Sequence, residues 1–265
     1  MPYVTLSKGR VHYSESGQGV PLVLLHANPG DSRDFEAIVP SLAQSHRVLA
    51  LDWPGYGLSD PLADPGAASV ADFREALRAF IAAVSLPPAV FIGNSIGANV
   101  AARLAIESPQ QVRGLVLVSP GGFTPHNTAT RLFCRLQGGR FSIPPRLFAR
   151  LYLKHRTPPV RSMLERAATS QATPDRLALN RAMWRSFAHA DNDLRPLAAR
   201  IDAPTALFFG QHDPVIPAHR DGQVAAHCMP FAQYAVLPCG HAPFAELPDV
   251  FLARVQRFLA ANGLT

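Results

Sequence analysis

The stretch Gly93-Asn94-Ser95-Ile96-Gly97 places a serine between two glycines, at positions i−2 and i+2. An apolar run that predicts a buried strand precedes it, and an alanine-rich pattern of helical spacing follows at once. A turn this sharp brings neighbouring backbone too close for a Cβ atom, so the flanking residues must be small. The hydroxyl would then stand clear beside a helix N-terminus, which favours developing negative charge. The spacing indicates nucleophilic chemistry at Ser95, and a glycine-rich turn with a helix-capping serine is the alternative.

The elements that would position this serine alternate along most of the chain. Apolar and alternating runs predict strands over 3–7, 11–16, 21–25, 48–51, 89–92, 115–118, 206–209 and 233–237. Amphipathic spacing predicts helices over 35–43, 70–84, 96–107, 218–228 and 248–260. Strands that alternate with helices predict an α/β fold with a doubly wound, mostly parallel, eight-stranded sheet.

The alternation lapses between residues 123 and 200, where arginine-rich helices are expected, with breaks at Gly138-Gly139, Pro144-Pro145 and Pro158-Pro159. This segment holds 14 Lys/Arg against 4 Asp/Glu, whereas the rest of the chain holds 11 against 15. The charge indicates either a solvated helical face or electrostatic steering of an anionic substrate or an acidic partner. No recognisable nucleic-acid-binding motif accompanies it, so nucleic acid is not an expected partner.

The composition of the chain limits the classes of protein to which it can belong. With 265 residues, 48% hydrophobic and 17% charged, the chain is expected to fold as one large globular domain or as one domain with an insertion. We expect no signal peptide, because residues 1–8 contain no long apolar region. We also expect no membrane partner, because no apolar run approaches the ~20 residues that span a bilayer. The three cysteines are widely spaced, which fits free thiols, a cytoplasmic location and no metal site. No P-loop or dinucleotide motif is present, so no cofactor is expected.

Together these features resemble the α/β-hydrolase fold family, and the resemblance covers essentially the whole chain. It rests on the serine turn, on Asp213 after a late strand and on His241 after the last strand, in the family's order Ser, Asp, His. The segment 26–30 resembles the family's oxyanion turn, and 52–59 resembles the loop after its next strand. The resemblance implies a core of residues 1–122 and 201–265, with a helical cap, or lid, over residues 123–200.

The resemblance also implies roles for individual residues. Ser95 would be the nucleophile and His241 the base that takes its proton, with Asp213 fixing the imidazole tautomer. The oxyanion hole would consist of the backbone N–H groups of Ile96 and Asn28. The alternatives without a catalytic role are that Asp213 is a turn aspartate before a proline and that His241 is an ordinary surface or buried histidine.

These roles predict a serine esterase that cleaves a small carboxylic ester or thioester through an acyl-enzyme. Three alternatives stay open. Residues 93–95, 119–122 and 180–184 resemble the meta-cleavage-product hydrolases, which break a carbon–carbon bond in dienoic keto acids; Asn94, Arg181 and Trp184 are then candidate substrate-binding residues. Residues 240–244 and the basic cap resemble esterases that act on acyl chains held by an acidic carrier protein. A non-catalytic, receptor-like ligand-binding protein is the alternative outside the enzymes. A monomer or a homodimer is compatible with all of these hypotheses.

Overall fold

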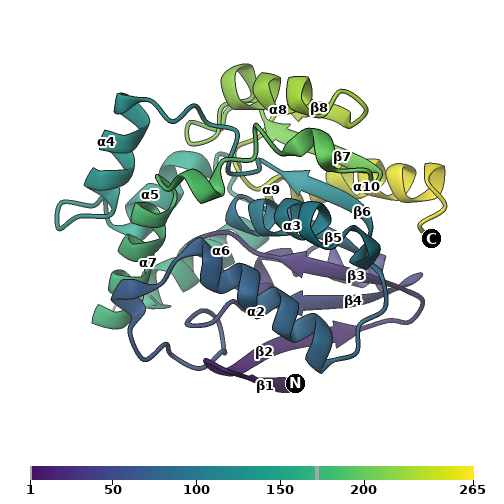
Figure 1. Cartoon of the computed structure of the whole chain (residues 1–265), viewed down its shortest axis with the longest axis horizontal. Coiled ribbons are helices and arrows are strands. Elements are labelled where there is room, and N and C mark those ends of the chain that lie inside the picture. Colours follow the sequence, from purple (N-terminus) through teal and green to yellow (C-terminus); the bar gives the residue numbers. More distant parts are fainter. Residues whose placement is uncertain (1, 171–172) are drawn as a thin grey trace.

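The computed structural model describes residues 2–170 and 173–265 and contains an eight-stranded sheet (Figure 1). The strand order is β1-β2-β4-β3-β5-β6-β7-β8, and of the described strands β2 alone runs against the others. This confirms the predicted α/β fold with its doubly wound, mostly parallel, eight-stranded sheet. The strands are β1 (Tyr3–Leu6), β2 (Gly9–Ser16), β3 (Val20–Leu25), β4 (His46–Leu51), β5 (Ala89–Asn94), β6 (Val112–Val118), β7 (Thr205–Gly210) and β8 (Gln233–Leu237).

The sheet is covered on both faces, which explains why its central strands are apolar at every position. In β3, Leu22 and Leu24 belong to one apolar cluster and Val23 and Leu25 to the other, and all four are fully buried. Successive side chains of a strand point to opposite faces, so an unbroken apolar run needs two layers of helices. Helices α2 (Val70–Ala83) and α3 (Ile96–Glu107) cover one face, in front of the sheet in Figure 1, and α10 (Pro248–Ala261) packs on the other.

Two helix predictions need correction. The single helix expected over 35–43 is wrong: the chain forms a 3₁₀ turn, η1 (Ser32–Phe35), and a separate short helix, α1 (Val39–Leu42). Pro40 explains the break, because its ring would clash with the carbonyl four residues earlier in a continuous helix. The helix expected over 218–228 begins as a π-helical segment, η6 (Ala218–Gly222), and becomes α-helical only in α8 (Gln223–Cys228).

In its described residues, the segment between β6 and β7 contains four α-helices. Three of them end or begin at the predicted breaks, whereas the fourth begins at Pro174. All four lie beyond the end of the sheet toward which the parallel strands point (Figure 1). None of the helices in the described part of the chain combines the length and apolar character that crossing a membrane requires. The division into a core and a cap stays a proposal. The four helices are α4 (Thr128–Gln137), α5 (Pro145–Tyr152), α6 (Pro158–Ser170) and α7 (Pro174–Ser186).

Smaller elements complete the chain. A helix of four residues, α9 (Pro243–Glu246), follows the turn after β8 and leads into α10. Short 3₁₀ turns connect the larger elements: η2 (Pro65–Ala67), η3 (Pro109–Gln111), η4 (Ala190–Asn192) and η5 (Ala198–Arg200).

Candidate active site

Ser95 lies in the sharp turn between β5 and α3 and has a φ of +56°, in the left-handed region that non-glycine residues rarely adopt. The turn leaves no room for side chains on either side of it. A Cβ on Gly93 would lie 2.5 Å from the backbone of Gly97 and Ala98, and one on Gly97 would meet the carbonyl oxygen of Leu25. The small flanking residues predicted from the sequence are therefore required by backbone contacts. Strain of this kind is typical of functional sites.

Asp213 and His241, which are 28 positions apart in the chain, form a buried hydrogen-bonded pair: Asp213 Oδ2 lies 2.6 Å from His241 Nδ1. An ionised carboxylate only accepts hydrogen bonds, so Nδ1 carries the proton and donates it, which leaves Nε2 able to accept one. The other carboxylate oxygen, Oδ1, accepts from the backbone N–H groups of Val215 at 2.8 Å and Ile216 at 3.2 Å. Both carboxylate oxygens are thus held in place.

The turn that carries His241 is fixed by residues that the sequence analysis did not single out. The Glu246 carboxylate, on α9, accepts hydrogen bonds from the backbone N–H groups of Gly240 and Ala242, at 3.0 and 3.2 Å. It also accepts from the N–H groups of Lys154 and His155, just after α5, at 2.8 and 3.0 Å. One buried carboxylate therefore ties the histidine turn to the segment between α5 and α6.

Tyr152, the last residue of α5, makes a second contact with this turn. Its carbonyl oxygen accepts from the His241 N–H at 2.9 Å, and the two rings meet edge to face with centroids 5.3 Å apart. The helices between β6 and β7 therefore touch the candidate base directly.

A cavity of about 360 Å³ lies over the serine turn and is lined by Ser95 and Ile96. Its walls come from α4, α7 and the chain after Asp213, and they include Phe133, Trp184 and Val215. Asp213 and His241 are not among the described residues that line it, and no hydrogen bond between described residues joins the Ser95 hydroxyl to His241. Catalytic hydrogen bonds are often long without substrate and shorten in the complex.

The two candidate oxyanion donors lie in different surroundings. Ile96 is the first residue of α3, so its N–H is one of the donors that have no acceptor within the helix. Asn28 precedes a cis peptide bond to Pro29 and is not among the described residues that line the cavity. Its side-chain oxygen accepts from the Tyr56 hydroxyl at 2.6 Å and from the Asn180 amide at 3.3 Å.

His26 anchors the turn that contains Asn28. Its Nε2 accepts from the Trp53 backbone N–H at 3.0 Å, so Nδ1 carries the proton and donates to the Ala27 carbonyl at 2.8 Å. Burial lowers the pKa of this imidazole, which keeps it neutral. His26 thus holds the backbone in place.

The three candidate substrate-binding residues lie in three different places. Trp184 lines the cavity and meets Phe133 edge to face, with ring centroids 5.5 Å apart. Asn94 is buried, and its amide donates to the carbonyls of Val118 and His241, each at 3.2 Å. Arg181 donates to the Ser142 hydroxyl at 3.2 Å, in the turn between α4 and α5. Neither Asn94 nor Arg181 is among the described residues that line the cavity.

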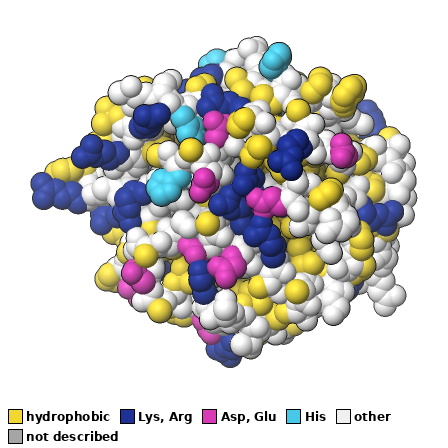
Figure 2. Space-filling model, viewed as in Figure 1, with side chains coloured by type: hydrophobic (Ala, Val, Ile, Leu, Met, Phe, Trp, Pro, Cys, Tyr) yellow, Lys and Arg dark blue, Asp and Glu magenta, His cyan; other side chains and the backbone are white. Residues whose placement is uncertain are grey.

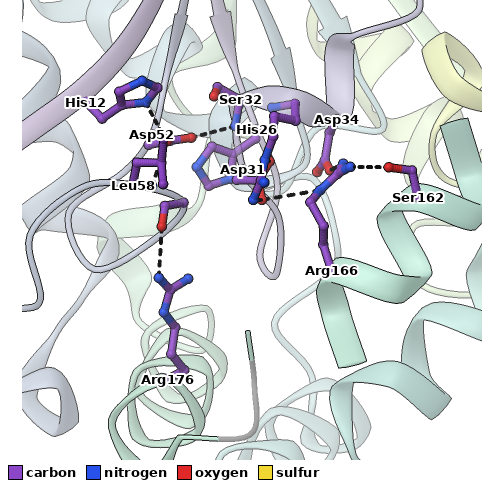
Figure 3. Close-up of polar contacts among 12 residues, drawn as sticks. His12, His26, Asp31, Ser32, Asp34, Asp52, Leu58, Ser162, Arg166 and Arg176 are labelled. Atoms are coloured by element: carbon purple, nitrogen blue, oxygen red, sulfur yellow. Dashed lines mark hydrogen bonds and ion pairs between the residues drawn. The ribbon is translucent and has the colours of Figure 1, made fainter. Parts of the chain in front are cut away.

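An ion cluster joins α6 to the chain after β3 (Figure 3). Arg166 of α6 lies 2.8 Å from Asp34 and 3.3 Å from Asp31, and its guanidinium is mostly buried. Nearby, Arg176 of α7 donates to the carbonyl of Gly57 at 2.9 Å. Burial, together with the negative charge of Asp31, raises the pKa of Asp34 to about 7 despite the opposing effect of Arg166.

We expect Asp34→Asn to remove a pH dependence of stability. The pKa of Asp34 in the folded chain lies well above the ordinary value of an aspartate, which is about 3.9, so between about pH 4 and 7 the folded chain keeps a proton that the unfolded chain releases. The wild type therefore loses stability as pH rises through this window, by up to about 1.4 kcal/mol per pH unit. Melting temperatures at pH 5 and pH 8 check this. The melting temperature of the variant, relative to that of the wild type, should be higher at pH 8 than at pH 5. A difference in melting temperature that is the same at both pH values would refute the raised pKa of Asp34.

The described residues contain no group of three or more His, Cys, Asp or Glu side chains that could hold a metal ion. The site consists, in what the structure describes, of a strained serine, a buried histidine–carboxylate pair, a helix N-terminus and a largely apolar cavity.

Comparisons with known proteins place the chain in a family. A family model for the alpha/beta hydrolase fold matches residues 20–248. The chain is 27% identical to a 2-hydroxy-6-oxo-6-phenylhexa-2,4-dienoate hydrolase of Burkholderia cepacia, over 97% of this chain and 93% of that protein. It is 26% identical to a pimeloyl-[acyl-carrier protein] methyl ester esterase of Nitrosomonas europaea, over 92% of this chain and 97% of that one.

Solved structures show the same fold. A thermophilic esterase from Thermogutta terrifontis superposes with a TM-score of 0.81 at 20% identity, covering 98% of each chain. The family model matches most of the sequence, and the resemblance inferred from the serine turn and the order Ser, Asp, His is thereby confirmed at the level of the family. This chain belongs to the α/β-hydrolase fold family.

Proposed function

We propose that this protein is a serine esterase that cleaves a carboxylic ester through an acyl-enzyme on Ser95. The observation that carries the proposal is the buried pair of His241 and Asp213, 2.6 Å apart, in a chain whose strained Ser95 faces a cavity of about 360 Å³. A serine hydroxyl is a weak nucleophile at neutral pH and needs such a base.

The reaction would run in two halves. His241 Nε2 takes the Ser95 proton as the hydroxyl oxygen attacks the ester carbonyl, and the backbone N–H groups of Ile96 and Asn28 stabilise the resulting oxyanion. The same imidazole returns the proton to the departing alcohol, which leaves an acyl-Ser95. A water molecule then gives its proton to His241 and attacks the acyl carbonyl, which releases the acid and restores the serine. Asp213 stabilises the imidazolium in both halves.

The cavity favours a substrate that is mostly apolar. Of its described lining residues, Arg220 alone carries a permanent positive charge. Its Nε and Nη2 atoms already donate to the buried Asp221 carboxylate, at 2.6 and 3.0 Å. A substrate carboxylate would have to compete with this ion pair. A neutral acyl chain packed against Phe133 and Trp184 fits the lining better.

Carbon–carbon bond hydrolysis is the second candidate. It is favoured by the Burkholderia cepacia relative, whose name specifies a dienoate substrate and which matches 97% of this chain. Against it, Arg181, the arginine predicted to bind such a carboxylate, contacts Ser142 in a turn outside the cavity. The name of the Nitrosomonas europaea relative specifies a methyl ester of an acyl chain on a carrier protein. Hydrolysis of such an ester would follow the same mechanism as our first candidate.

The test compares substrates on one enzyme preparation. We expect hydrolysis of p-nitrophenyl esters within the series from acetate to decanoate, and much slower turnover of 2-hydroxy-6-oxo-6-phenylhexa-2,4-dienoate. Efficient turnover of the dienoate with negligible ester hydrolysis would reject the esterase in favour of the second candidate. Ligand binding without turnover of either substrate would leave the receptor-like alternative.

A residue on α4 should set the acyl chain length. Thr130 lines the cavity, whereas Thr128, on the same helix, is exposed and is not among its described lining residues. Thr130→Phe takes up part of the cavity, so we expect kcat/KM for decanoate to fall about tenfold relative to acetate. Thr128→Phe is the matched control and should leave the ratio unchanged. An equal loss on acetate and decanoate would show that α4 does not limit the acyl chain.

A further inference from the structure

Helices α4 and α5 and the turn between them expose large apolar side chains. On α4, Leu132 and Leu136 are 54% and 51% exposed, and on α5, Leu147 and Leu151 are 51% and 50% exposed. Phe141, in the turn, is 76% exposed. Each leucine pair is spaced four residues apart and so lies on one side of its helix. We call this surface, with Ile143, the α4–α5 face.

The structure holds this face in place. Cys134 and Gln137 of α4 are buried, so the exposed leucines lie on a helix that is already packed. The Gln137 side-chain oxygen accepts from the Ile143 N–H at 3.0 Å, and Arg185 of α7 donates to the Gly138 carbonyl at 2.7 Å. Single exposed apolar residues are normal on a protein surface, whereas several large ones on packed helices indicate an interaction site.

The apolar side chains are interleaved with arginines. Figure 2 shows hydrophobic and Lys/Arg side chains gathered at the left edge, where Figure 1 places α4 and the turn after it. The chain carries no Asp or Glu from Phe123 to Leu164. A partner that covers this face would therefore need to be anionic and able to take up apolar side chains. The exposed arginines of this face are Arg131, Arg135, Arg140, Arg146 and Arg150.

We propose that the α4–α5 face docks on a lipid surface that contains anionic phospholipid. Alternating arginine and large apolar residues on short helices are typical of segments that lie in a membrane interface. Such binding needs no spanning helix, so it is compatible with the described helices, none of which could cross a membrane. The sequence-based expectation of no membrane partner rested on spanning segments alone.

Two other occupants fit the face less well. A second copy of this chain, related by a two-fold axis, would bring arginines against arginines. An acidic protein would satisfy the charges, but Phe141 lies in the turn between α4 and α5 and is 76% exposed, which suits insertion into a lipid layer better than contact with a flat protein surface. Phe133 both lines the cavity over Ser95 and is 41% exposed, so the face adjoins the cavity wall.

The proposal is tested with vesicles and needs no enzymatic activity. Wild-type protein should co-sediment with vesicles of phosphatidylcholine and phosphatidylglycerol at a ratio of 3:1, and much less with phosphatidylcholine alone. Phe141→Ser should weaken this binding at least fivefold, and Arg135→Glu with Arg146→Glu at least tenfold. The matched control is Phe231→Ser, which removes a phenylalanine that is fully exposed outside the face and should change nothing.

Three outcomes would overturn the proposal. The first is no binding to the anionic vesicles, or equal binding to neutral ones. The second is equal weakening by Phe231→Ser and Phe141→Ser. The third is an interaction with a different partner in the absence of vesicle binding. This would be binding to an acidic acyl carrier protein, or self-association seen by light scattering, that Phe141→Ser abolishes. All variants change exposed side chains, so circular dichroism should show an unchanged fold for each.

Discussion

Replacing Ser95 by alanine is expected to lower kcat for p-nitrophenyl butyrate by about 10⁴-fold or more. The variant keeps the cavity, the helix N-terminus and the pair of His241 and Asp213, but it has no oxygen with which to form the acyl-enzyme. Residual turnover would come from substrate binding and oxyanion stabilisation alone. The measurement is the steady-state rate over a range of substrate concentrations, and KM should change much less than kcat.

Ser85→Ala provides the matched control for this experiment. Ser85 also has a positive φ, of 48°, but it is exposed just after the end of α2 and is not among the described residues that line the cavity. We expect its activity to equal that of the wild type. If Ser95→Ala retains more than about a tenth of the wild-type kcat while folded, the proposed nucleophile is wrong.

Asp213→Asn is expected to lower kcat by about 10⁴-fold, by changing the histidine tautomer. Asp213 Oδ1 accepts from two backbone N–H groups, of Val215 and Ile216, so the oxygen of an asparagine would stay there. The NH₂ group would then face His241 Nδ1, where the carboxylate oxygen now lies. Nδ1 would have to accept, the proton would move to Nε2, and Nε2 could no longer take a proton from Ser95.

The matched control is Asp60→Asn, which alters a partly exposed ion pair with Arg10. It should leave kcat within about twofold of wild type, because a surface ion pair contributes little to the free energy of unfolding and its loss should leave the fold intact. A loss in Asp213→Asn that is accompanied by a lower melting temperature and an altered near-UV spectrum would point to a structural role instead.

Much of the fold could be predicted because its signals are local. The glycines around Ser95 reflect backbone contacts within one turn, and the two proline pairs mark where α5 and α6 begin. The failure at 35–43 is also instructive: the apolar spacing favoured one helix, but Pro40 forbids it, and the prediction gave periodicity too much weight.

The supporting parts of the site could not be predicted, because they depend on contacts between distant segments. Glu246 accepts from N–H groups that are about ninety residues away, at Lys154 and His155, and nothing in its local sequence distinguishes it from an ordinary helix residue. Arg181 has the right charge for a substrate carboxylate, but its direction is set by the packing of α7 against α4. The roles of Ser95, Asp213, His241, Ile96 and Asn28 stay predictions.

The exposed apolar face of α4 shows a further limit. An apolar stripe at helical spacing ordinarily predicts the side of a helix that packs on the core. In α4 the leucines of the stripe face solvent, and Cys134 and Gln137 take the buried side. Only the structure distinguishes these two arrangements.

The central claim is that Ser95 is the nucleophile, and covalent labelling tests it most directly. The protein is treated with diethyl p-nitrophenyl phosphate, and the labelled peptide is identified by mass spectrometry while residual esterase activity is followed. We predict one diethylphosphoryl group per chain, on Ser95, with activity lost in proportion to labelling and no labelling in Ser95→Ala. Complete inactivation with the label on another residue, or full labelling of Ser95 with activity retained, would contradict the account.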